Sequence, residues 1–417
     1  MIHINDNKIK RIVFNFKNTV VINATNIGYK FHGIGVYSLN ILKELTRLNT
    51  DLNFIVYLNT SCKPHVEETD FPDNFIVIWV SSIISPDNNF KGHILRLIYS
   101  NYLSIKHWKY LLFNTSQLEI NFFRKNQVVT IHDVIPLLFK EYHRKQYPYF
   151  KIILTYGLKY AKYVLTPSEH SKDLLQQIYN LSDKRIKFIH NGAHTIGLNK
   201  RDSNNEPEQK YILYIGRINK MKNIKNLLKA YSLIGDKISH KLVIVGDNIT
   251  NLQREMKNAD LSFGLKERVV FKHDIDESSK CMLMKNASLL VFASLYEGFG
   301  LPPLEAMACG CPVIVSDNSS LPEVCGEAAY YINPQNPSEI AEGIIKVLNN
   351  STLRNKLIKN GLQRAKQFSW TNSAKEHLNV LEHVIMHSRL PLEKKLNNYL
   401  PILEEKISSI SLEGINS

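Results

Sequence analysis

The alternation of short β-rich runs with amphipathic helical segments constrains this chain most. Thirteen apolar runs read as buried strands, and helical patterns such as 36–48, 168–179, 224–234 and 337–348 separate most neighbours. Strands joined through helices lie parallel, in sheets with helices on both faces. The sequence therefore predicts doubly wound α/β sheets, with strands at 19–23, 53–58, 75–80, 110–113, 127–131, 163–165, 186–189, 211–215, 241–245, 268–271, 288–292, 312–315 and 329–332.

The length of the chain predicts two domains, because 417 residues exceed what one ordinary core holds. A polar run at 199–210 separates the two groups of predicted strands and reads as a linker. Ligands of open α/β sheets bind beyond the carboxyl ends of the strands. Two such domains therefore predict a cleft between two sets of strand ends.

Composition and cysteines predict a soluble, folded protein of a reducing compartment. Hydrophobic residues make up 44% and charged residues 22%, and no apolar run approaches the roughly 18 residues of a membrane-spanning helix. The first residues lack the apolar core of a signal peptide. The five cysteines have no zinc-ligand spacing, and Cys309 and Cys311 read as small buried thiols at a helix-to-strand junction.

The net charge of +14 is unevenly distributed. Residues 1–200 hold 25 Lys and Arg against 14 Asp and Glu, and residues 201–417 hold 27 against 24. A basic half points to an anionic partner, and a solvated basic surface is the alternative. Basic and aromatic residues alternate at 106–110 and 143–151, which favours an anionic membrane surface. We expect no nucleic-acid partner, since no recognised binding motif accompanies the charge.

The segment 296–317, YEGFGLPPLEAMACGCPVIVSD, carries two glutamates with seven residues between them, Glu297 and Glu305. A buried strand precedes it, glycines form a turn, and Pro302 and Pro303 suit the first turn of a helix. On an architectural interpretation Glu305 only complements the positive helix end. On the other interpretation, strand, glycine loop and helix N-terminus present free backbone donors to an anionic ligand.

Three further groups lie where predicted strands end. Arg217 and Lys222 follow the strand at 211–215, where a diphosphate would bind, although both could be plain surface charges. Gly33 and Gly35 open a helix after the first strand, and they indicate either a phosphate site or an ordinary turn. His132 lies at the end of another strand, where it is either a residue that lines a ligand site or a buried structural histidine.

Taken together, residues 1–387 resemble the glycosyltransferases of family 4, retaining enzymes of the GT-B fold, which has two Rossmann-like doubly wound domains facing a cleft. The resemblance is strongest over 211–387 and rests on the pair Glu297 and Glu305, on Gly216-Arg217 with Lys222-Asn223, on Gly33-Ile34-Gly35, and on His132-Asp133. It implies an N-terminal acceptor-side domain at 1–200, a nucleotide-sugar-binding domain at 207–368, a helix at 369–387 that crosses back to the first domain, and a helical tail at 388–417.

The resemblance also implies roles for these residues. Glu305 would accept hydrogen bonds from the ribose hydroxyls, and Glu297 from hydroxyls of the transferred sugar. Arg217 and Lys222 would bind the diphosphate and stabilise its charge as the sugar departs. The backbone at Phe299, Gly300 and Leu301 would cradle sugar and phosphate, Gly33 and Gly35 would approach the donor phosphate, and His132 would line the donor sugar near the reacting carbon.

We therefore expect a retaining hexosyltransferase that uses a nucleotide-sugar, with His132, Glu297, Arg217 and Lys222 as catalytic residues. The stretch 130–143, TIHDVIPLLFKEYH, resembles members that add mannose during bacterial surface-polysaccharide or lipopolysaccharide assembly. The expected donor is GDP-mannose, and the alternative is a UDP-hexose or UDP-N-acetylhexosamine. His273 stands where the family usually has a small residue near the base, which leaves the base open.

The remaining expectations concern acceptor, metal and location. The acceptor is a glycan, carried on a lipid, and the enzyme is cytoplasmic or peripheral on the inner face of the plasma membrane. No cofactor and no obligatory metal is expected, because Asp276 of the triplet 274–276 reads as a helix cap rather than a metal ligand. A non-catalytic basic protein that binds nucleic acid or membrane is the alternative from a different class.

Overall fold

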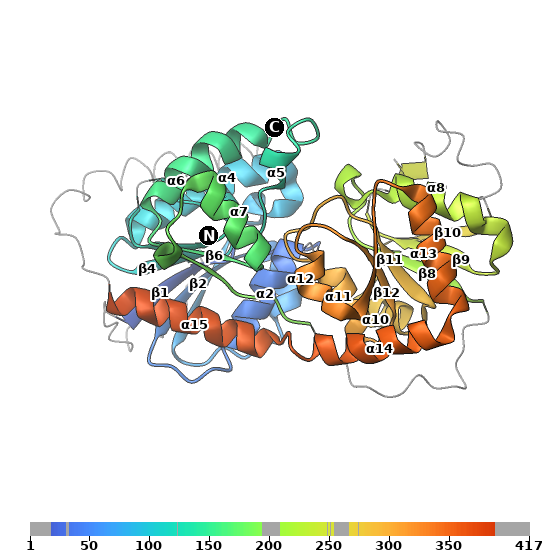
Figure 1. The fold of residues 1–417 in the computed structure, drawn as a ribbon. Coiled ribbons are helices and arrows are strands. Elements are labelled where there is room, and N and C mark those ends of the chain that lie inside the picture. The colour runs from blue at the N-terminus through green and yellow to red at the C-terminus, as the bar shows by residue number, and fades with distance from the viewer. Residues whose placement is uncertain are drawn as a thin grey trace, which may run out of the picture. The chain divides into compact units, whose positions relative to one another are not determined.

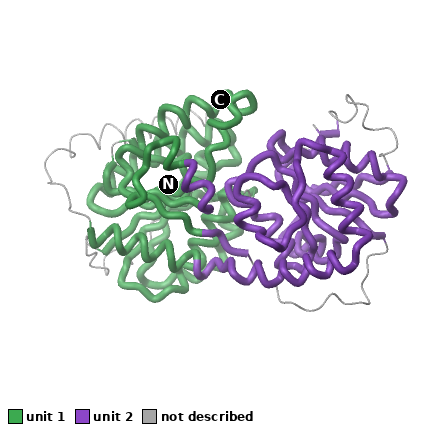
Figure 2. The backbone as a smooth tube through the Cα atoms, in the orientation of Figure 1, with its two compact units in different colours: residues 1–166, 175–189, 373–417 green, residues 167–174, 190–372 purple. Residues whose placement is uncertain are grey.

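A computed structural model describes residues 18–30, 33–122, 124–193, 209–247, 249–250, 252–253, 267–273 and 275–387. The chain divides into two compact units, each treated by itself below. Unit 1 holds residues 1–166, 175–189 and 373–417, and unit 2 holds 167–174 and 190–372 (Figure 2). Most of the predicted linker and the whole predicted tail lie outside the described residues, so the domain boundaries stay predictions.

Unit 1 contains a seven-stranded, all-parallel sheet in the order β3-β2-β1-β4-β5-β6-β7. Its five inner strands are buried along almost their whole length, as expected when helices cover both faces of a sheet, whereas the edge strands β3 and β7 are partly exposed. The strands are β1 (Thr19–Asn23), β2 (Asn53–Asn59), β3 (Phe75–Val80), β4 (Leu111–Asn114), β5 (Gln127–Thr130), β6 (Tyr163–Thr166) and β7 (Ile186–Phe188).

Helices connect most consecutive strands of unit 1, whereas β4 and β5 are joined by a loop with a short 3₁₀ turn at Gln117–Glu119 (Figure 1). A π-helical turn at Tyr149–Leu154 precedes α6, and the first part of α7 groups with unit 2. The predicted crossing helix at 369–387 is α15, of which residues 373 onward group with unit 1. The helices are α2 (Gly33–Leu45), α3 (Lys63–Val66), α4 (Asn89–Lys106), α5 (Ile135–Leu138), α6 (Thr155–Tyr160), α7 (Glu169–Tyr179) and α15 (Trp370–Met386).

Unit 2 contains a six-stranded, all-parallel sheet in the order β10-β9-β8-β11-β12-β13. One continuous hydrophobic core fills the space between this sheet and its helices. The strands are β8 (Tyr211–Ile215), β9 (Lys241–Val245), β10 (Val269–Lys272), β11 (Leu289–Phe292), β12 (Val313–Ser316) and β13 (Ala329–Ile332). The helices are α8 (Ile224–Ile234), α10 (Glu277–Asn286), α11 (Leu301–Ala308), α12 (Leu321–Cys325), α13 (Pro337–Asn349) and α14 (Ser351–Ala365).

The order of the strands reverses once in each sheet. In unit 1 the reversal lies between β1 and β4, and in unit 2 it lies between β8 and β11. At such a point the connections leave the two neighbouring strands in opposite directions, and the space beyond their carboxyl ends stays open for a ligand. The predicted site residues of unit 2 follow β8 and β11, at this point of the sheet.

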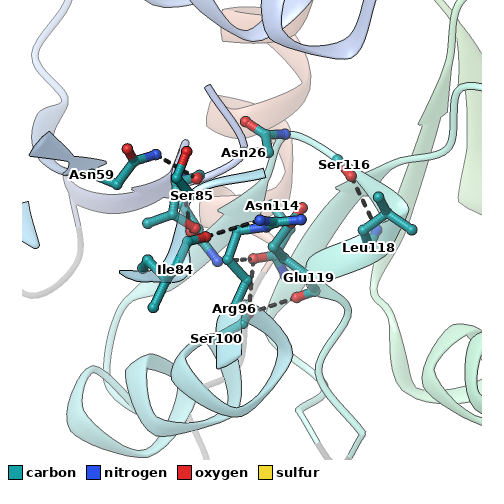
Figure 3. A network of polar contacts seen from close by, with 12 residues as sticks. Asn26, Asn59, Ile84, Ser85, Arg96, Ser100, Asn114, Ser116, Leu118 and Glu119 are labelled. Atoms are coloured by element: carbon teal, nitrogen blue, oxygen red, sulfur yellow. Dashed lines mark hydrogen bonds and ion pairs between the residues drawn. The ribbon is translucent and has the colours of Figure 1, made fainter. Parts of the chain in front are cut away.

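A buried polar network lies beside the carboxyl end of β4 in unit 1 (Figure 3). Arg96 on α4 donates through Nε to Oε1 of Glu119 at 2.9 Å, and through Nη1 to the carbonyl of Ile84 at 2.8 Å. The side chains of Arg96 and Glu119 are 3% and 0% exposed. Burial raises the pKa of Glu119, and the Arg96 guanidinium opposes that rise. The ion pair therefore opposes the protonation that burial of Glu119 favours.

We expect Arg96→Met to destabilise unit 1 by about 3–5 kcal/mol, because it leaves the buried Glu119 without its cation. Adding Glu119→Gln to Arg96→Met should recover part of that loss, since the buried charge is then absent. Urea unfolding gives the free energies, and hydrogen exchange in β4 reports on unit 1 separately. Lys91→Met, at an exposed position on the same helix, is the control. A loss below about 1 kcal/mol in Arg96→Met would contradict this account.

Candidate active site

The loop after β8 begins with a glycine that the packing requires. Gly216 has a φ of +149°, and a Cβ on Gly246 would lie 2.3 Å from the Gly216 carbonyl oxygen. Asp247 accepts the N–H of Ile218 at 3.0 Å and lies 3.5 Å from Nε of Arg217. The Arg217 side chain is 61% exposed. The loop thus holds a solvent-accessible guanidinium at the switch point, as the sequence predicted.

Lys222 lies at the end of a 3₁₀ turn that two asparagines fix in place. Asn219 caps the turn by accepting the N–H of Lys222 at 3.1 Å. Asn223, with a φ of +55°, donates to the carbonyls of Ala293 at 3.0 Å and Pro334 at 2.6 Å. These bonds tie the loop after β8 to the carboxyl end of β11. They also set the direction in which Lys222 leaves the backbone.

Lys222 and Glu297, predicted separately from the sequence, are in direct contact. The ammonium Nζ lies 2.5 Å from Oε1 of Glu297 and 5.2 Å from the ring centroid of Phe292. The side chains of Lys222 and Glu297 are 19% and 9% exposed. A cation and a carboxylate therefore share one nearly buried site, which can offer a positive charge to a phosphate and an acceptor to a hydroxyl.

Serine hydroxyls bind the carbonyls of the glycine loop between β11 and α11. Ser320 donates to the carbonyls of Glu297 at 3.0 Å and Phe299 at 2.9 Å, and Ser168 donates to that of Gly298 at 2.7 Å. In a trans peptide the N–H points away from the carbonyl. The N–H groups that follow these carbonyls, at Gly298, Phe299 and Gly300, therefore point to the opposite side.

Helix α11 continues this set of donors. Pro302 and Pro303 occupy its first turn as predicted, and Gly300, with a φ of +103°, precedes it. A Cβ on Gly300 would lie 2.7 Å from a methyl group of Leu321, so the turn excludes larger residues. Loop and helix start together form a positive, donor-rich surface suited to an anion.

Glu305 lies in the second turn of α11 and contacts a lysine from another helix. The first turn of α11 holds no acidic residue, so Glu305 does not complement the helix end. Its Oε1 accepts from Nζ of Lys280 on α10 at 2.8 Å. Burial raises the pKa of Glu305, and the Lys280 cation opposes that rise. The sequence analysis did not identify Lys280.

In unit 1, the two predicted glycines open α2 with ordinary backbone geometry. A Cβ on Gly33 would have no atom within 4 Å, and one on Gly35 would meet only backbone at 4.0 Å. Neither glycine has a positive φ. Packing within the described residues therefore does not require glycine here, and the open space leaves the start of α2 accessible. Phe31 and His32, which precede these glycines in the sequence, lie outside the described residues.

His132 follows β5 and is held as a neutral ring. Its Nε2 must donate to the carbonyl of Thr115, 2.9 Å away, because a carbonyl only accepts. Burial lowers the pKa of His132 to about 4, against the opposing effect of that hydrogen bond. At neutral pH the ring then carries its proton on Nε2 and keeps Nδ1 as an acceptor. His132 can accept a hydrogen bond at Nδ1, but it is not a cation that could serve as a general acid.

A chain of hydrogen bonds that sequence reasoning missed packs against His132. The ring of Tyr37 on α2 meets the ring of His132 edge-on, with centroids 4.6 Å apart. His377 on α15 donates through Nδ1 to the carbonyl of Ser373 at 2.7 Å, so its Nε2 accepts from the Tyr37 hydroxyl at 2.7 Å. Thr130 in turn lies 2.8 Å from that hydroxyl. The part of α15 within unit 1 therefore fixes the ring that supports His132.

Asp276 and the cysteines were weighed from the sequence as possible metal ligands. Asp276 caps α10 by accepting the N–H of Ser279 at 2.7 Å, which confirms the predicted cap, while Asp274 lies outside the described residues. Within the described ranges no three His, Cys, Asp or Glu side chains group as metal ligands. Cys311 is buried, and the half-buried Cys309 lies 3.7 Å from Cys281, sulfur to sulfur. No described helix is long and apolar enough to cross a membrane.

We expect the ring of His132 to show no titration between pH 6 and 8. Its folded pKa lies below the ordinary value near 6.5, so the proton binds only as the pH falls toward about 4. Two-dimensional NMR of ¹⁵N-labelled histidines gives both the tautomer and the midpoint, with His132→Gln to assign the signal. A midpoint near 6.5, or a proton on Nδ1, would contradict the neutral acceptor.

Comparison with known proteins gives the family. The family described as glycosyl transferases group 1 matches residues 197–364, and Glycosyltransferase Family 4 matches residues 31–195. The O-antigen chain mannosyltransferase RfbU of Salmonella typhimurium is 31% identical over 324 residues, covering 76% of this chain and 87% of RfbU. O-antigen chain mannosyltransferase B of Escherichia coli is 30% identical over 262 residues, covering 60% of this chain and 69% of that protein.

Solved structures give the fold. Sucrose-phosphate synthase of Thermosynechococcus elongatus superposes with a TM-score of 0.71 at 18% identity, over 89% of this chain and all of that one. WaaG, a glycosyltransferase of lipopolysaccharide biosynthesis, gives 0.65 at 15% identity, over 87% and 99%. HepE of Anabaena, solved with UDP-glucose, gives 0.66 at 16% identity, over 88% and 99%. The chain is therefore a family 4 glycosyltransferase of the GT-B fold, an enzyme that uses a nucleotide-sugar.

Proposed function

We propose that this enzyme transfers mannose from GDP-mannose to a lipid-linked glycan during the assembly of a cell-surface polysaccharide. The observation that carries the donor site is the contact between Lys222 and Glu297 beside the N–H groups of the glycine loop. A diphosphate needs cations and N–H donors, whereas a sugar needs acceptors for its hydroxyls. This end of the unit 2 sheet offers both kinds of group within one loop cluster.

The residues of the site have distinct roles in this proposal. The Arg217 side chain is exposed, and its Nε lies 3.5 Å from the Asp247 carboxylate, which makes a long ion pair. The guanidinium is therefore available to bind the diphosphate through two of its N–H groups. Lys222 adds a second cation, and the two together stabilise the charge that develops as the sugar departs. Glu297 accepts from the sugar hydroxyls, Glu305 accepts from the ribose, and His132 accepts at Nδ1 from the donor sugar.

The choice of mannose follows the names of the relatives. Two relatives at 30–31% identity are O-antigen mannosyltransferases. UDP-glucose, which HepE holds in its crystal structure, is the alternative donor class. His273, which is exposed just after β10, has a polar ring that could contact either base. The donor panel described below separates these two alternatives.

We propose retention of the anomeric configuration without an obligatory metal. Arg217 and Lys222 supply the positive charge that a divalent ion would otherwise bring to the diphosphate. No carboxylate is assigned as a covalent nucleophile, because Glu297 is engaged by Lys222. The leaving phosphate instead assists the incoming hydroxyl on the same face of the sugar.

We expect Arg217→Ala, Lys222→Ala and Glu305→Ala each to lower turnover by ~10²–10³. Removing one preorganised charge contact weakens transition-state stabilisation. Arg217 is exposed, so its loss should not change stability. Lys222→Ala and Glu305→Ala each break a nearly buried ion pair and should also lower stability, so turnover is measured at a temperature where circular dichroism shows the variants folded. Sugar transfer from radiolabelled GDP-mannose measures turnover, and Lys229→Ala, an exposed lysine on α8, is the control. Wild-type activity in Arg217→Ala at excess donor would contradict the site.

The same preparation tests donor, metal and stereochemistry. A donor present at about 100 times its Kd should stabilise the protein by about 2.7 kcal/mol, so thermal shifts rank GDP-, UDP- and ADP-sugars. A larger shift with UDP-sugars would replace mannose in the proposal. Activity lost in EDTA and restored by manganese would overturn the metal-free part. NMR of the first-formed product would overturn retention if it detected the inverted anomer.

The lipid-linked acceptor is proposed from the surface of unit 1. Arg144, Lys145 and Lys151 are exposed, in the segment that runs from α5 to α6. The same segment exposes the large apolar side chains Leu138, Tyr142, Ile152 and Tyr156, by 40–62%. In contrast, Tyr149 donates to the Gln117 carbonyl and Phe150 is 2% exposed, so part of the predicted aromatic cluster belongs to the core.

Helix α4 extends this surface. Phe90, Ile94 and Ile98 recur every fourth residue, and so lie on one face of the helix, with 66%, 38% and 36% of each exposed. His93 on α4 packs against Tyr149 of the π-helical turn, with ring centroids 5.2 Å apart, which makes the two segments neighbours. Exposed apolar groups edged by cations suit the headgroup region of an anionic membrane.

We expect the protein to float with liposomes that contain anionic lipid, and to bind less as salt rises. Changing Arg144, Lys145 and Lys151 together to Glu should abolish most binding, since each cation contributes about 1 kcal/mol near such a surface. Changing Lys225, Lys229 and Lys237 to Glu makes the same charge change on exposed lysines of unit 2 and is the control. A wild type that stays soluble at low salt would refute membrane docking and leave the donor site unaffected.

A further inference from the structure

Lys280 is a buried cation with carboxylate partners on two helices. It lies in the first turn of α10, and its side chain is 18% exposed. Nζ lies 2.8 Å from Oε1 of Glu305 on α11 and 3.1 Å from Oε2 of Glu277 on its own helix. The Glu305 side chain is 16% exposed, whereas that of Glu277 is 64% exposed. Lys280 therefore has one nearly buried partner, Glu305, and one exposed partner, Glu277. The nearly buried partner is the residue proposed to bind ribose.

The contact uses one oxygen of Glu305. The described hydrogen bond to this carboxylate ends on Oε1, from Lys280. A carboxylate that accepts the two hydroxyls of a ribose needs further lone pairs, and Oε2 supplies them. A protonated carboxyl group would carry a hydrogen on one oxygen and lose part of this accepting capacity. The charge state of Glu305 therefore decides how well it can hold a diol.

Burial alone would favour the protonated form of Glu305. Burial raises the pKa of this carboxyl, the Lys280 cation lowers it, and the Glu277 carboxylate on α10 raises it again. The thiol of Cys309, at the end of α11, also faces Glu305, and burial raises its pKa so that it stays neutral. Among the described groups that act on Glu305, Lys280 is thus the cation that favours the carboxylate.

We propose that Lys280 is a positioning residue of the donor site: it holds Glu305 as a carboxylate with Oε1 engaged, and leaves Oε2 to accept the 2′- and 3′-hydroxyls of the donor ribose. This rests on the proposed function of unit 2 as the nucleotide-sugar site. The alternative is that Lys280 only joins α10 to α11. That purely structural role would weaken binding of every ligand equally at every pH.

The test measures binding of GDP, UDP and their 2′,3′-dideoxy forms by calorimetry from pH 6 to 9. The variants are Lys280→Met, Lys280→Arg and, as an exposed control, Lys229→Met. Losing the Lys280 cation removes the interaction that lowers the pKa of Glu305, so that pKa rises. We therefore expect Lys280→Met to bind the better of the two nucleotides roughly tenfold more weakly than wild type at pH 6. The difference should shrink as the pH rises toward 9, because a growing fraction of Glu305 is then ionised in both proteins.

Two comparisons isolate the ribose. The pH-dependent loss should vanish with the dideoxy nucleotide, which lacks the hydroxyls, and Lys280→Arg should restore the wild-type profile. In a Glu305→Gln background, Lys280→Met should add nothing, because no carboxylate remains to be held. The comparison in the Glu305→Gln background still tests the proposal if Lys280→Met alone is unstable.

The outcomes distinguish a failure of the role proposed for Lys280 from a failure of the proposed donor site. Equal loss at all pH values, or equal loss with ribose and dideoxyribose, would overturn the role of Lys280 while leaving the donor site in place. An unchanged Lys280→Met would do the same. A wild type that binds neither GDP nor UDP would instead refute the proposed donor site itself.

Discussion

Two nearly buried carboxylates in unit 2 depend on one lysine each. Glu297 is paired with Lys222 at 2.5 Å, and Glu305 is paired with Lys280 at 2.8 Å. An uncompensated charge in such surroundings costs several kcal/mol, so each lysine offsets a charge that would otherwise destabilise unit 2. The two pairs differ in origin, since Lys222 follows β8 and Lys280 lies on α10. The site therefore depends on charged side chains that several elements bring together.

The topology of the sheet explains why these pairs can form. All strands of unit 2 are parallel, so every loop that follows a strand begins at the same edge. The reversal of strand order between β8 and β11 makes the loops after those two strands neighbours, although 75 residues separate Lys222 from Glu297. Ser320, which follows β12, then fixes the carbonyls of the glycine loop from the next strand along the sheet.

Sequence patterns predicted the strands well, and they placed Arg217, Lys222 and Glu297 correctly in the loops that follow β8 and β11. All thirteen predicted strands are confirmed within one or two residues, because strands buried on both faces form continuous apolar runs. Arg217, Lys222 and Glu297 were identifiable because each lies in the loop that follows such a run. Functional residues that follow strands can be located from the sequence, because the apolar run of the strand precedes them. Parallel strands end at the same edge of the sheet, so these residues come close together in the fold.

The partners of those residues cannot be located from a sequence pattern. Lys280 is one of two lysines on α10, and Tyr37 contacts His377 across 340 residues. Ser168, which holds the Gly298 carbonyl, is 130 residues from its partner. No period or spacing links such residues, since the contact is made only when separate elements pack together. Whether a histidine is neutral, or a carboxylate ionised, is decided by this packing and so lies beyond a single sequence.

The two units accordingly contribute different chemistry. In unit 1 burial lowers the pKa values of His132 and His377 to about 4, so these two histidines near the end of β5 are neutral at physiological pH. In unit 2 the equivalent region holds paired ions. The excess positive charge of the first 200 residues is therefore not a property of the His132 region. It belongs to exposed residues such as Arg144 and Lys151, where a cation can act on a partner without any desolvation of the interior.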